Sequence, residues 1–515
     1  DCFGYGFNLP TIARHMGLIG FSTQKLAWNK SLAVPIPFAL GKWHGNDGNF
    51  IYASLDPGVY ETKIEDPLRQ DEIIRDQLMR NDGISMRYYG TGDIGGAPDQ
   101  ESVRNLETDL GEKNGIEVIS ATPDDVYAEM ADRDLPSYSG ELLLRRHGVG
   151  CYTSRAIAKR WNAQAERLAD ATERANSLAA VLGYPYPKRE IDTAWKRFLW
   201  HQFHDDITGT SIPEAYAISY NDYIISLNQL SEELVGGIRN VSAHLDTTGK
   251  GVPIIVFNPV AFQRKEVVRV RVPEGDFQVY QAEDVIPSQR RDDVLQFTAE
   301  VSGTGLKVYH ILPGKTETDN SLLYSKTEDH IFQNEFYRVM VDQTGDIISV
   351  FDLELNMELL QDPIRLVRFD NESRKWPSWE ILYHDLESPQ ELEYRDVEIK
   401  LLEKGPVRLV LEIKRSFGHS DITQQISVMA GIKRVEIDYQ IDWFEQASLL
   451  KLDFPLVLEP ELAAYDCGAG VIYRGINKTN LYEVPAQEFV SLSDEARTIS
   501  LMSDCKYGWD RPERN

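Results

Sequence analysis

We expect a multidomain α/β + α + β chain, in which an α/β layer is followed by a helical bundle and then by β-sandwich layers. At 515 residues the chain is too long for one ordinary core. Apolar residues recur at three- and four-residue steps in its second quarter, as in helices. In its second half they alternate with polar residues, as in half-buried strands. These observations predict separate domains of different class.

The N-terminal region, residues 1–123, mixes short apolar runs such as "LIGFST" and "GISMRYYG" with charged segments such as "PLRQDEIIRDQLMR". That mixture is expected of strands and helices in an α/β layer. Residues 124–245 change to helical periodicity, with one apolar face running from Trp161 to Leu182. A second helix is predicted after "GYPYPKRE" and a third over "IPEAYAISYNDYIISLNQLSEELVGGIRNV", so we expect a three-helix bundle. The buried side of the second helix is predicted to carry Trp195, Phe198, Leu199 and Phe203.

Period-two alternation begins after "TTGKG", in segments such as "EVVRVRVP" and "VEIDYQIDW". The segment "NEFYRVMVDQTGDIISVFD" predicts two strands about a turn at Gly345. We therefore place a small β-sandwich at residues 250–325 and a large one at residues 326–515.

Charge and composition exclude some partners. Lys and Arg number 54 against 81 Asp and Glu, a formal charge of -27, which would repel a phosphate backbone, so no nucleic acid partner is expected. No apolar run is long enough to cross a bilayer, so no membrane partner is expected either. Four cysteines are too sparse for a disulfide framework. The compartment and the oligomeric state, including a homo-oligomer, stay open.

The decapeptide "HQFHDDITGT" holds the first candidate site. If the second helix continues through Asp205, then His201, His204 and Asp205 fall at i, i+3 and i+4 on adjoining parts of one face. Imidazole nitrogen and carboxylate oxygen are ligand types that zinc takes. The alternative is a helix end at which histidine and aspartate cap and solvate the last turn.

Two carboxylates in glycine-rich surroundings extend this site. Asp1 opens "DCFGYG", and Asp93 lies in "YYGTGDIGGAPD"; both resemble exits from strand to loop, where α/β layers build sites. A carboxylate pair suits glycosyl transfer, in which one attacks the anomeric carbon and the other donates a proton. The alternative for Asp93 is a turn-stabilising role.

Taken together, these stretches resemble glycoside hydrolase family 38, the zinc-dependent α-mannosidases. "DCFGYGFNLP" is similar to the strand end that carries the family's nucleophilic aspartate, and "FHDDITGT" is similar to its helical-domain signature. "GTGDIGG" resembles the Gly-Asp-His-Gly-Gly stretch of bacterial-type members, with Ile94 in place of the histidine. "GELLLRRHGVGCYTSRAIAKRWN" resembles the start of the family's helical domain, and "VPIIVFNPVAFQR", "NEFYRVMVDQTGDIISVFD" and "SDCKYGWD" resemble its β segments.

The resemblance implies a retaining α-mannosidase acting on terminal α-linked mannose, with zinc as its cofactor. It implies Asp1 as nucleophile and zinc ligand, His204 as second zinc ligand, Asp205 and His201 in supporting roles, and Asp93 as general acid/base. Retention of configuration predicts that the carboxyl groups of Asp1 and Asp93 stand about 5 Å apart. The resemblance also implies an incomplete (β/α)-barrel-like N-terminal domain and a galactose mutarotase-like large sandwich.

The resemblance places two further zinc ligands in a His-x-Asp element upstream of Asp1, and no such element occurs between Asp1 and Asp93. We therefore expect a chain truncated at both ends that binds zinc weakly and hydrolyses little.

Other candidates for substrate contact are Trp43, by stacking on a sugar face, and His44 and Asp47 beside it. Arg145, Arg146 and Tyr152 lie in the segment that resembles the start of the helical domain. Two other functions stay open: a carbohydrate-binding or scaffold protein that has lost the chemistry, and a metal-dependent deacetylase or similar hydrolase.

Overall fold

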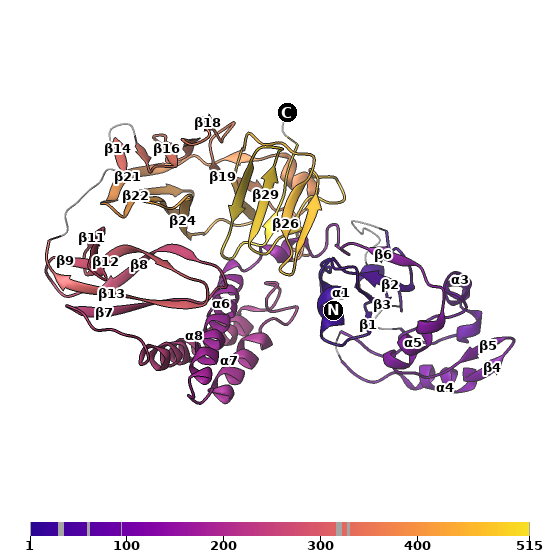
Figure 1. The fold of residues 1–515 in the computed structure, drawn as a ribbon. Coiled ribbons are helices and arrows are strands. Elements are labelled where there is room, and N and C mark those ends of the chain that lie inside the picture. The colour runs from indigo at the N-terminus through magenta and orange to yellow at the C-terminus, as the bar shows by residue number, and fades with distance from the viewer. Residues whose placement is uncertain are drawn as a thin grey trace.

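The computed structural model describes residues 2–28, 35–58, 62–93, 95–315, 322–326 and 330–513. An N-terminal α/β region lies at one end of the molecule, and the helices and the β regions lie at the other (Figure 1). The N-terminus faces the junction between these two ends (Figure 1). The three-class order predicted from the sequence is therefore present.

The N-terminal region is built around a four-stranded sheet of order β1-β3-β2-β6. Its strands are β1 (Gly20–Ser22), β2 (Leu40–His44), β3 (Phe50–Ser54) and β6 (Ser137–Ser139). Helices and a small hairpin surround it: α1 (Leu9–His15), α2 (Lys25–Trp28), α3 (Glu72–Arg80), α4 (Gln100–Asp109), α5 (Pro123–Glu129), β4 (Gly111–Lys113) and β5 (Ile116–Val118).

Two expectations about this region need correction. β2 runs antiparallel to β3, because a short turn at Gly45–Asn49 joins them as a hairpin, so the described strands form a mixed sheet and not a run of parallel barrel strands. β6 pairs in parallel with β2, so the segment that contains α5 and β6 lies with the N-terminal sheet, whereas the boundary at residue 123 had placed it with the helices.

The helical region contains α6 (Ala156–Val181), α7 (Lys188–Trp200) and α8 (Pro213–Ser242), which pack together as predicted (Figure 1). Buried small residues on α6 let α8 approach closely, and Phe198, Tyr223 and Leu230 fill the centre. The predicted buried side of α7 is right for Trp195 and Phe198 and wrong for Leu199 and Phe203, which are 44% and 58% exposed. Leu199 faces outward on the last turn, and Phe203 lies beyond the helix end.

The first β region consists of two facing antiparallel sheets, of order β10-β9-β13-β7 and β11-β12-β8. Val268 and Val270 point between them, as the alternation predicted. Its strands are β7 (Val252–Asn258), β8 (Arg264–Arg271), β9 (Phe277–Gln281), β10 (Asp284–Ile286), β11 (Ser288–Arg291), β12 (Val294–Val301) and β13 (Gly305–Pro313).

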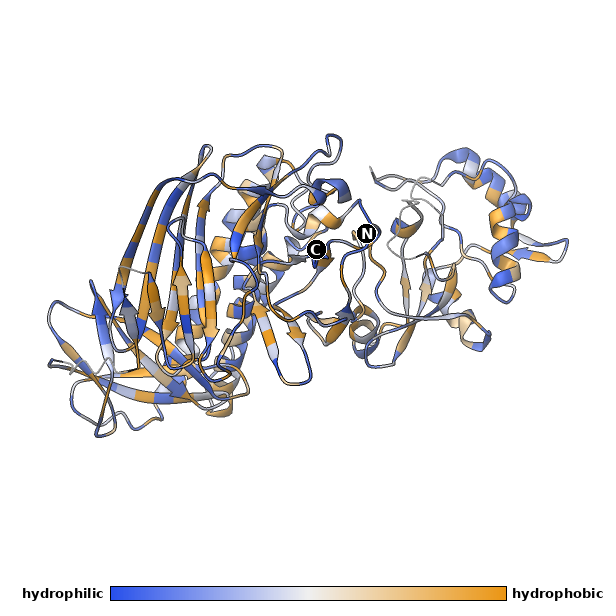
Figure 2. Ribbon diagram, turned by 90° about the horizontal axis from the view of Figure 1, so that it is seen from above, coloured by the Kyte–Doolittle hydropathy of each residue, from blue (hydrophilic) through white to orange (hydrophobic). Residues whose placement is uncertain are grey.

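The second β region packs several sheets around the largest apolar cluster of the described residues. The hairpin predicted about Gly345 joins β16 to β17, and Gly345 has the positive φ of 92° that this turn requires. Apolar and polar residues alternate along many of the strands (Figure 2). The strands are β14 (Tyr324–Lys326), β15 (Ile331–Gln333), β16 (Tyr337–Val341), β17 (Ile347–Asp352), β18 (Met357–Glu358), β19 (Arg365–Asp370), β20 (Gln390–Glu391), β21 (Arg395–Lys404), β22 (Arg408–Phe417), β23 (Ser420–Met429), β24 (Val435–Asp442), β25 (Ser448–Asp453), β26 (Ala463–Asp466), β27 (Val471–Arg474), β28 (Val484–Pro485), β29 (Phe489–Ser493), β30 (Thr498–Met502) and β31 (Gly508–Trp509).

Among the described residues, none of the helices combines the length and the hydrophobicity of a membrane span. All four cysteines are free.

Candidate functional site

The decapeptide His201–Thr210 is a compact turn at the end of α7 and not a continuation of that helix. α7 ends at Trp200, and His201 is its C-cap residue. The expectation of a helix through Asp205 is therefore wrong. From His201 on, the backbone makes three-residue hydrogen bonds, from His201 N to Phe198 O and from Gln202 N to Leu199 O, in place of helical ones. Both ring nitrogens of His201 are engaged by carboxylates, one of which follows it in the turn and the other of which lies on α8.

His201 forms the inner face of this turn. It is 2% exposed, and its Nδ1 and Nε2 donate to Asp206 Oδ2 at 2.7 Å and to Asp222 Oδ2 at 3.0 Å. Burial by itself lowers the pKa of His201, but the two carboxylates outweigh it and the net pKa is raised. His201 is thus an ion-paired clamp between α7 and α8 and does not face a ligand.

The "ITGT" end of the motif closes the turn. Gly209 has φ 86°, and a Cβ there would stand 2.6 Å from Ser154 O, so only glycine fits. The buried ammonium of Lys159 on α6 donates to Ile207 O at 2.8 Å, and Thr210 Oγ1 donates to Asp205 Oδ1 at 2.9 Å. Burial lowers the pKa of Lys159 to about 8. These contacts fix the backbone that presents His204 and Asp205.

His204 and Asp205 form the outer face of the same turn. Their side chains are 20% and 42% exposed, with His204 Nε2 3.4 Å from Asp205 Oδ2. Burial is the largest influence and lowers the pKa of His204, against the opposing charge of Asp205. An imidazole nitrogen and a carboxylate oxygen are therefore presented together at the surface of the turn.

The start of the chain reaches this outer face. The ring of Phe3 lies edge-on to His204, with 6.2 Å between the ring centroids, although 201 positions separate them in sequence. Tyr5 and Leu142 exchange two backbone hydrogen bonds of 2.9 Å, which fix the direction of the segment. Asp1, two residues before Phe3, lies outside the described residues. Its place beside His204 therefore stays a prediction.

A segment of the second β region reaches the residues beside Phe3 through the hydrogen-bond partners of Glu380. This carboxylate is 4% exposed and accepts hydrogen bonds from Ser373 Oγ at 2.8 Å, Arg146 Nη2 at 3.1 Å and His147 Nδ1 at 3.4 Å. The His147 ring lies edge-on to Phe3, with centroids 6.1 Å apart. Glu380 thus connects the β region to the residues beside His204. Arg146, a predicted substrate contact, is held by this ion pair with about half of its side chain exposed.

Asp93, the predicted acid/base, is exposed and has φ 60°, a conformation that aspartate tolerates in loops. No strand is assigned between Arg80 and Asp93 among the described residues, so Asp93 does not follow a strand end as expected. Ile94 lies outside the described residues.

Trp43 is a structural residue, and its prediction as a sugar contact is wrong, whereas Tyr152 is half-buried and its role as a sugar contact stays a prediction. Trp43 is fully buried in the core of the N-terminal region, where its Nε1 donates to Gly140 O at 2.8 Å. The hydroxyl of Tyr152 is buried without a hydrogen-bond partner among the described residues, and burial raises the pKa of Tyr152. Asp47 organises its own loop through Thr11 and Asn49. Trp43 is thus placed by burial in the core, and Asp47 by the hydrogen bonds of its own loop.

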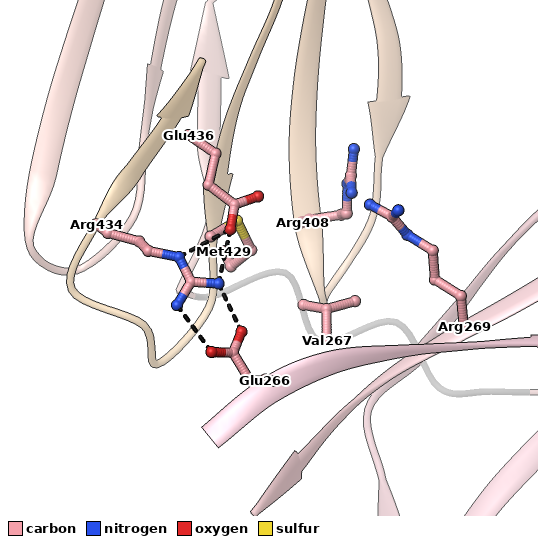
Figure 3. Close-up of a pocket in the computed structure, with 7 residues that line it drawn as sticks. All are labelled: Glu266, Val267, Arg269, Arg408, Met429, Arg434 and Glu436. Carbon is pink, nitrogen blue, oxygen red and sulfur yellow. Dashed lines mark hydrogen bonds and ion pairs between the residues drawn. The ribbon is translucent and has the colours of Figure 1, made fainter. Parts of the chain in front are cut away.

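A cavity of about 210 Å³ lies elsewhere, between β8 and the sheet that holds β22 to β24 (Figure 3). The guanidinium of Arg434 bridges Glu266 and Glu436 there, each with one distance of 2.6 Å (Figure 3). Its lining contains none of the predicted site residues. The contact joins the two β regions.

Sequence reasoning missed Phe3, Lys25, His147 and Glu380. Lys25 is 4% exposed, and its Nζ lies 5.0 Å from the centroid of the Phe3 ring. Glu380 and His147 are 233 positions apart. The sequence points to one of these residues, since His147 lies in "GELLLRRHGVGCYTSRAIAKRWN", the segment that resembles the start of the family's helical domain.

Three family models match most of the chain, in order. "Glycosyl hydrolases family 38 N-terminal domain" matches residues 1–141, "Alpha mannosidase middle domain" residues 149–238 and "Glycosyl hydrolases family 38 C-terminal domain" residues 332–515. Among curated proteins, "Alpha-mannosidase G" of Dictyostelium discoideum is 25% identical over 99% of this chain and 51% of its own length. "Alpha-mannosidase 2C1" of Homo sapiens is 25% identical over 99% of this chain and 48% of its own.

A crystal structure of an alpha-mannosidase from Enterococcus faecalis V583 superposes with a TM-score of 0.80. Its identity is 16%, and the match covers 99% of this chain and 68% of the other, so it shows the fold alone. The chain spans about half the length of the curated relatives named above.

The order of the three family matches follows the order of the α/β, helical and β regions in the structure. The chain belongs to glycoside hydrolase family 38.

Proposed function

We propose that this chain is part of a retaining α-mannosidase that removes terminal α-linked mannose from glycans. The observation that carries the proposal is the approach of Phe3 to His204, at 6.2 Å between ring centroids. It supports a site shared by the N-terminal segment and the turn that follows α7. The named α-mannosidase relatives give the substrate class.

In this proposal Asp1 attacks the anomeric carbon and Asp93 donates a proton to the leaving oxygen, then takes one from water. That division of roles requires the two carboxyl groups to stand about 5 Å apart. Asp205 would accept a hydrogen bond from a sugar hydroxyl with Oδ2, because Oδ1 already accepts from Thr210.

A zinc ion fits this site in kind, because the imidazole nitrogen of His204 and the carboxylate oxygen of Asp1 are ligand types that zinc takes. The Asp205 carboxylate, 3.4 Å from His204 Nε2, would support the ion from beside it. His204 and Asp1 would hold it. When bound, zinc supplies Lewis acidity and a fixed anchor for two sugar hydroxyls. Phe3 and the Glu380–His147 pair orient the side chains around that anchor.

We also propose the four-domain division expected from the sequence, with its first boundary moved from residue 123 to about residue 141. The pairing of β6 with β2 and the extent of the N-terminal family match support this change.

Covalent trapping tests the proposal. A fluorinated mannosyl fluoride forms a glycosyl-enzyme quickly and releases it slowly, so it should label the wild-type chain on the peptide that contains Asp1. Asp1→Asn should abolish labelling, and a chelator should reduce it until zinc is restored. Labelling of another carboxylate, or equal labelling of Asp1→Asn, would refute the assignment.

The second candidate is a carbohydrate-binding or scaffold protein of the same fold, which the exposed loop position of Asp93 favours. Calorimetry with an α-mannoside separates the two. Binding without labelling or hydrolysis would support the second candidate.

A further inference from the structure

A group of metal-ligand side chains lies apart from the His204 site, at the other end of the segment that carries Glu380. Glu372, His384 and Asp385 each offer a ligand atom, and these atoms lie within 4.8 Å of one another. His384 and Asp385 belong to the short 3-10 helix Tyr383–Glu387, and Glu372 follows β19. No residue of this group takes part in the proposed mannosidase chemistry.

The separations in this group match those between neighbouring ligands of one metal ion and are long for a charge-assisted hydrogen bond. His384 Nε2 lies 3.3 Å from Glu372 Oε2 and 3.3 Å from Asp385 Oδ1. Around a tetrahedral zinc with bonds of about 2.0 to 2.2 Å, neighbouring ligand atoms stand about 3.3 Å apart. A charge-assisted hydrogen bond would be about 2.7 to 2.9 Å.

A second observation points to a cation. The Asp385 side chain is 2% exposed, and its Oδ2 accepts from the backbone N of Glu372 at 3.2 Å. Its Oδ1 is buried and accepts no hydrogen bond from any described residue, yet it faces His384 Nε2. A buried carboxylate oxygen of this kind is costly unless a proton or a metal ion compensates it. The nearby Glu372 carboxylate increases that cost.

We propose that Glu372, His384 and Asp385 bind a divalent metal ion of the zinc type, at a structural site separate from the one proposed at His204. Glu372 and His384 are exposed, so solvent completes the coordination. Calcium fits less well, since it prefers six to eight oxygen ligands.

The ion would close the segment between Glu372 and Asp385. That segment docks on the turn before α6: Trp379 O accepts from Gly148 N at 2.8 Å and from Gly150 N at 3.0 Å, and Ser378 O accepts from Ser154 Oγ at 2.7 Å. Linking its two ends lowers the entropy of its open states and thus stabilises the docking. The metal site would therefore stabilise the contact that Glu380 makes with His147.

Zinc counting in a background without His204 tests this inference. Metal-free His204→Ala protein is titrated with zinc chloride by calorimetry, and the zinc retained after gel filtration is measured by mass spectrometry. We expect about one zinc per chain in His204→Ala and at least a tenfold weaker affinity after His384→Ala is added. Glu372→Gln, at an exposed position, should weaken binding without affecting folding. Calcium chloride should not replace zinc.

The matched control is His419→Ala, which removes another exposed histidine of the same β region and should leave zinc binding unchanged. Zinc should raise the melting temperature of His204→Ala and of His204→Ala/His419→Ala, but not of His204→Ala/His384→Ala. Equal zinc affinity in the two double variants would overturn the proposal and indicate that a protonated His384 bridges the two carboxylates instead.

Discussion

The inner and outer faces of the turn His201–Thr210 hold the same residue types, histidine and aspartate, but differ in the burial and ion pairing of the histidine. On the inner face, the His201 imidazole is 97% buried and has a carboxylate at each ring nitrogen. On the outer face, His204 has the Asp205 carboxylate 3.4 Å away and the Phe3 ring beside it. The number and distance of the carboxylate partners, and not the residue type, raise one pKa and leave the other lowered. The inner face of the turn, through His201, thus fixes the backbone that presents His204 on the outer face.

The largest effect is expected on the outer face. Because the chain is expected to hydrolyse little, His204→Ala should lower its residual aryl α-mannoside hydrolysis to background, since the loss of a zinc ligand removes transition-state stabilisation. Unfolding by urea should change by less than about 1 kcal/mol, since the side chain is partly exposed. Hydrolysis rates at saturating zinc and the urea midpoint measure both. An unchanged rate would remove the functional difference between the two faces.

The second largest effect is expected at Glu380, whose partner His147 lies beside Phe3 at the outer face. Glu380→Ala leaves His147 and Ser373 buried without their shared acceptor, at a cost of about 2 to 4 kcal/mol in the free energy of unfolding. Glu387→Ala, an exposed carboxylate a few residues on, is the control and should cost less than about 0.5 kcal/mol. Urea denaturation compares them. Equal, small effects would mean that Glu380 does not hold the junction together.

The backbone that separates the faces should rank third. Gly209→Ala combines a positive φ with a Cβ 2.6 Å from Ser154 O, and we expect a loss of about 2 to 3 kcal/mol. Gly183→Ala is a matched control, because Gly183 also has a positive φ but open space around it, and it should cost about 1 kcal/mol. The difference between their unfolding free energies isolates the contact with Ser154.

The features that sequence could predict are those encoded by local periodicity. The apolar face of α6 from Trp161 to Ala179 and the alternation in β8 and β24 appear where expected, whereas Leu182 lies past the helix end and is 43% exposed. Gly345 turns its hairpin because the required φ is positive. Each of these patterns repeats within about ten residues, so a single segment carries the information.

Features set by distant partners were not predictable. α7 ends at Trp200, and the His201 ring that follows pairs with Asp222 on another helix, a contact that no local signal indicates. Trp43 is core because residues far along the chain, such as Gly140, cover it. Glu380 supports the site across 233 positions, and its sequence surroundings do not point to His147. The identity of His204 as the presented residue came from the resemblance and not from periodicity.

The smallest effect, and the clearest sign, is expected from pH on the inner face. His201 has a raised pKa in the folded state, so the stability that it contributes is fully present below about pH 6.5 and is lost as pH rises through the folded value. The gap in unfolding free energy between wild type and His201→Gln should therefore be larger at about pH 6 than at about pH 9. Asp222→Asn removes one of the two partner charges and should shrink this pH-dependent part while keeping the shape of the side chain. Urea denaturation followed by circular dichroism measures all three proteins at both pH values. A gap that grows with pH would mean that His201 is neutral in the folded state, and both faces of the turn would then present the same kind of imidazole.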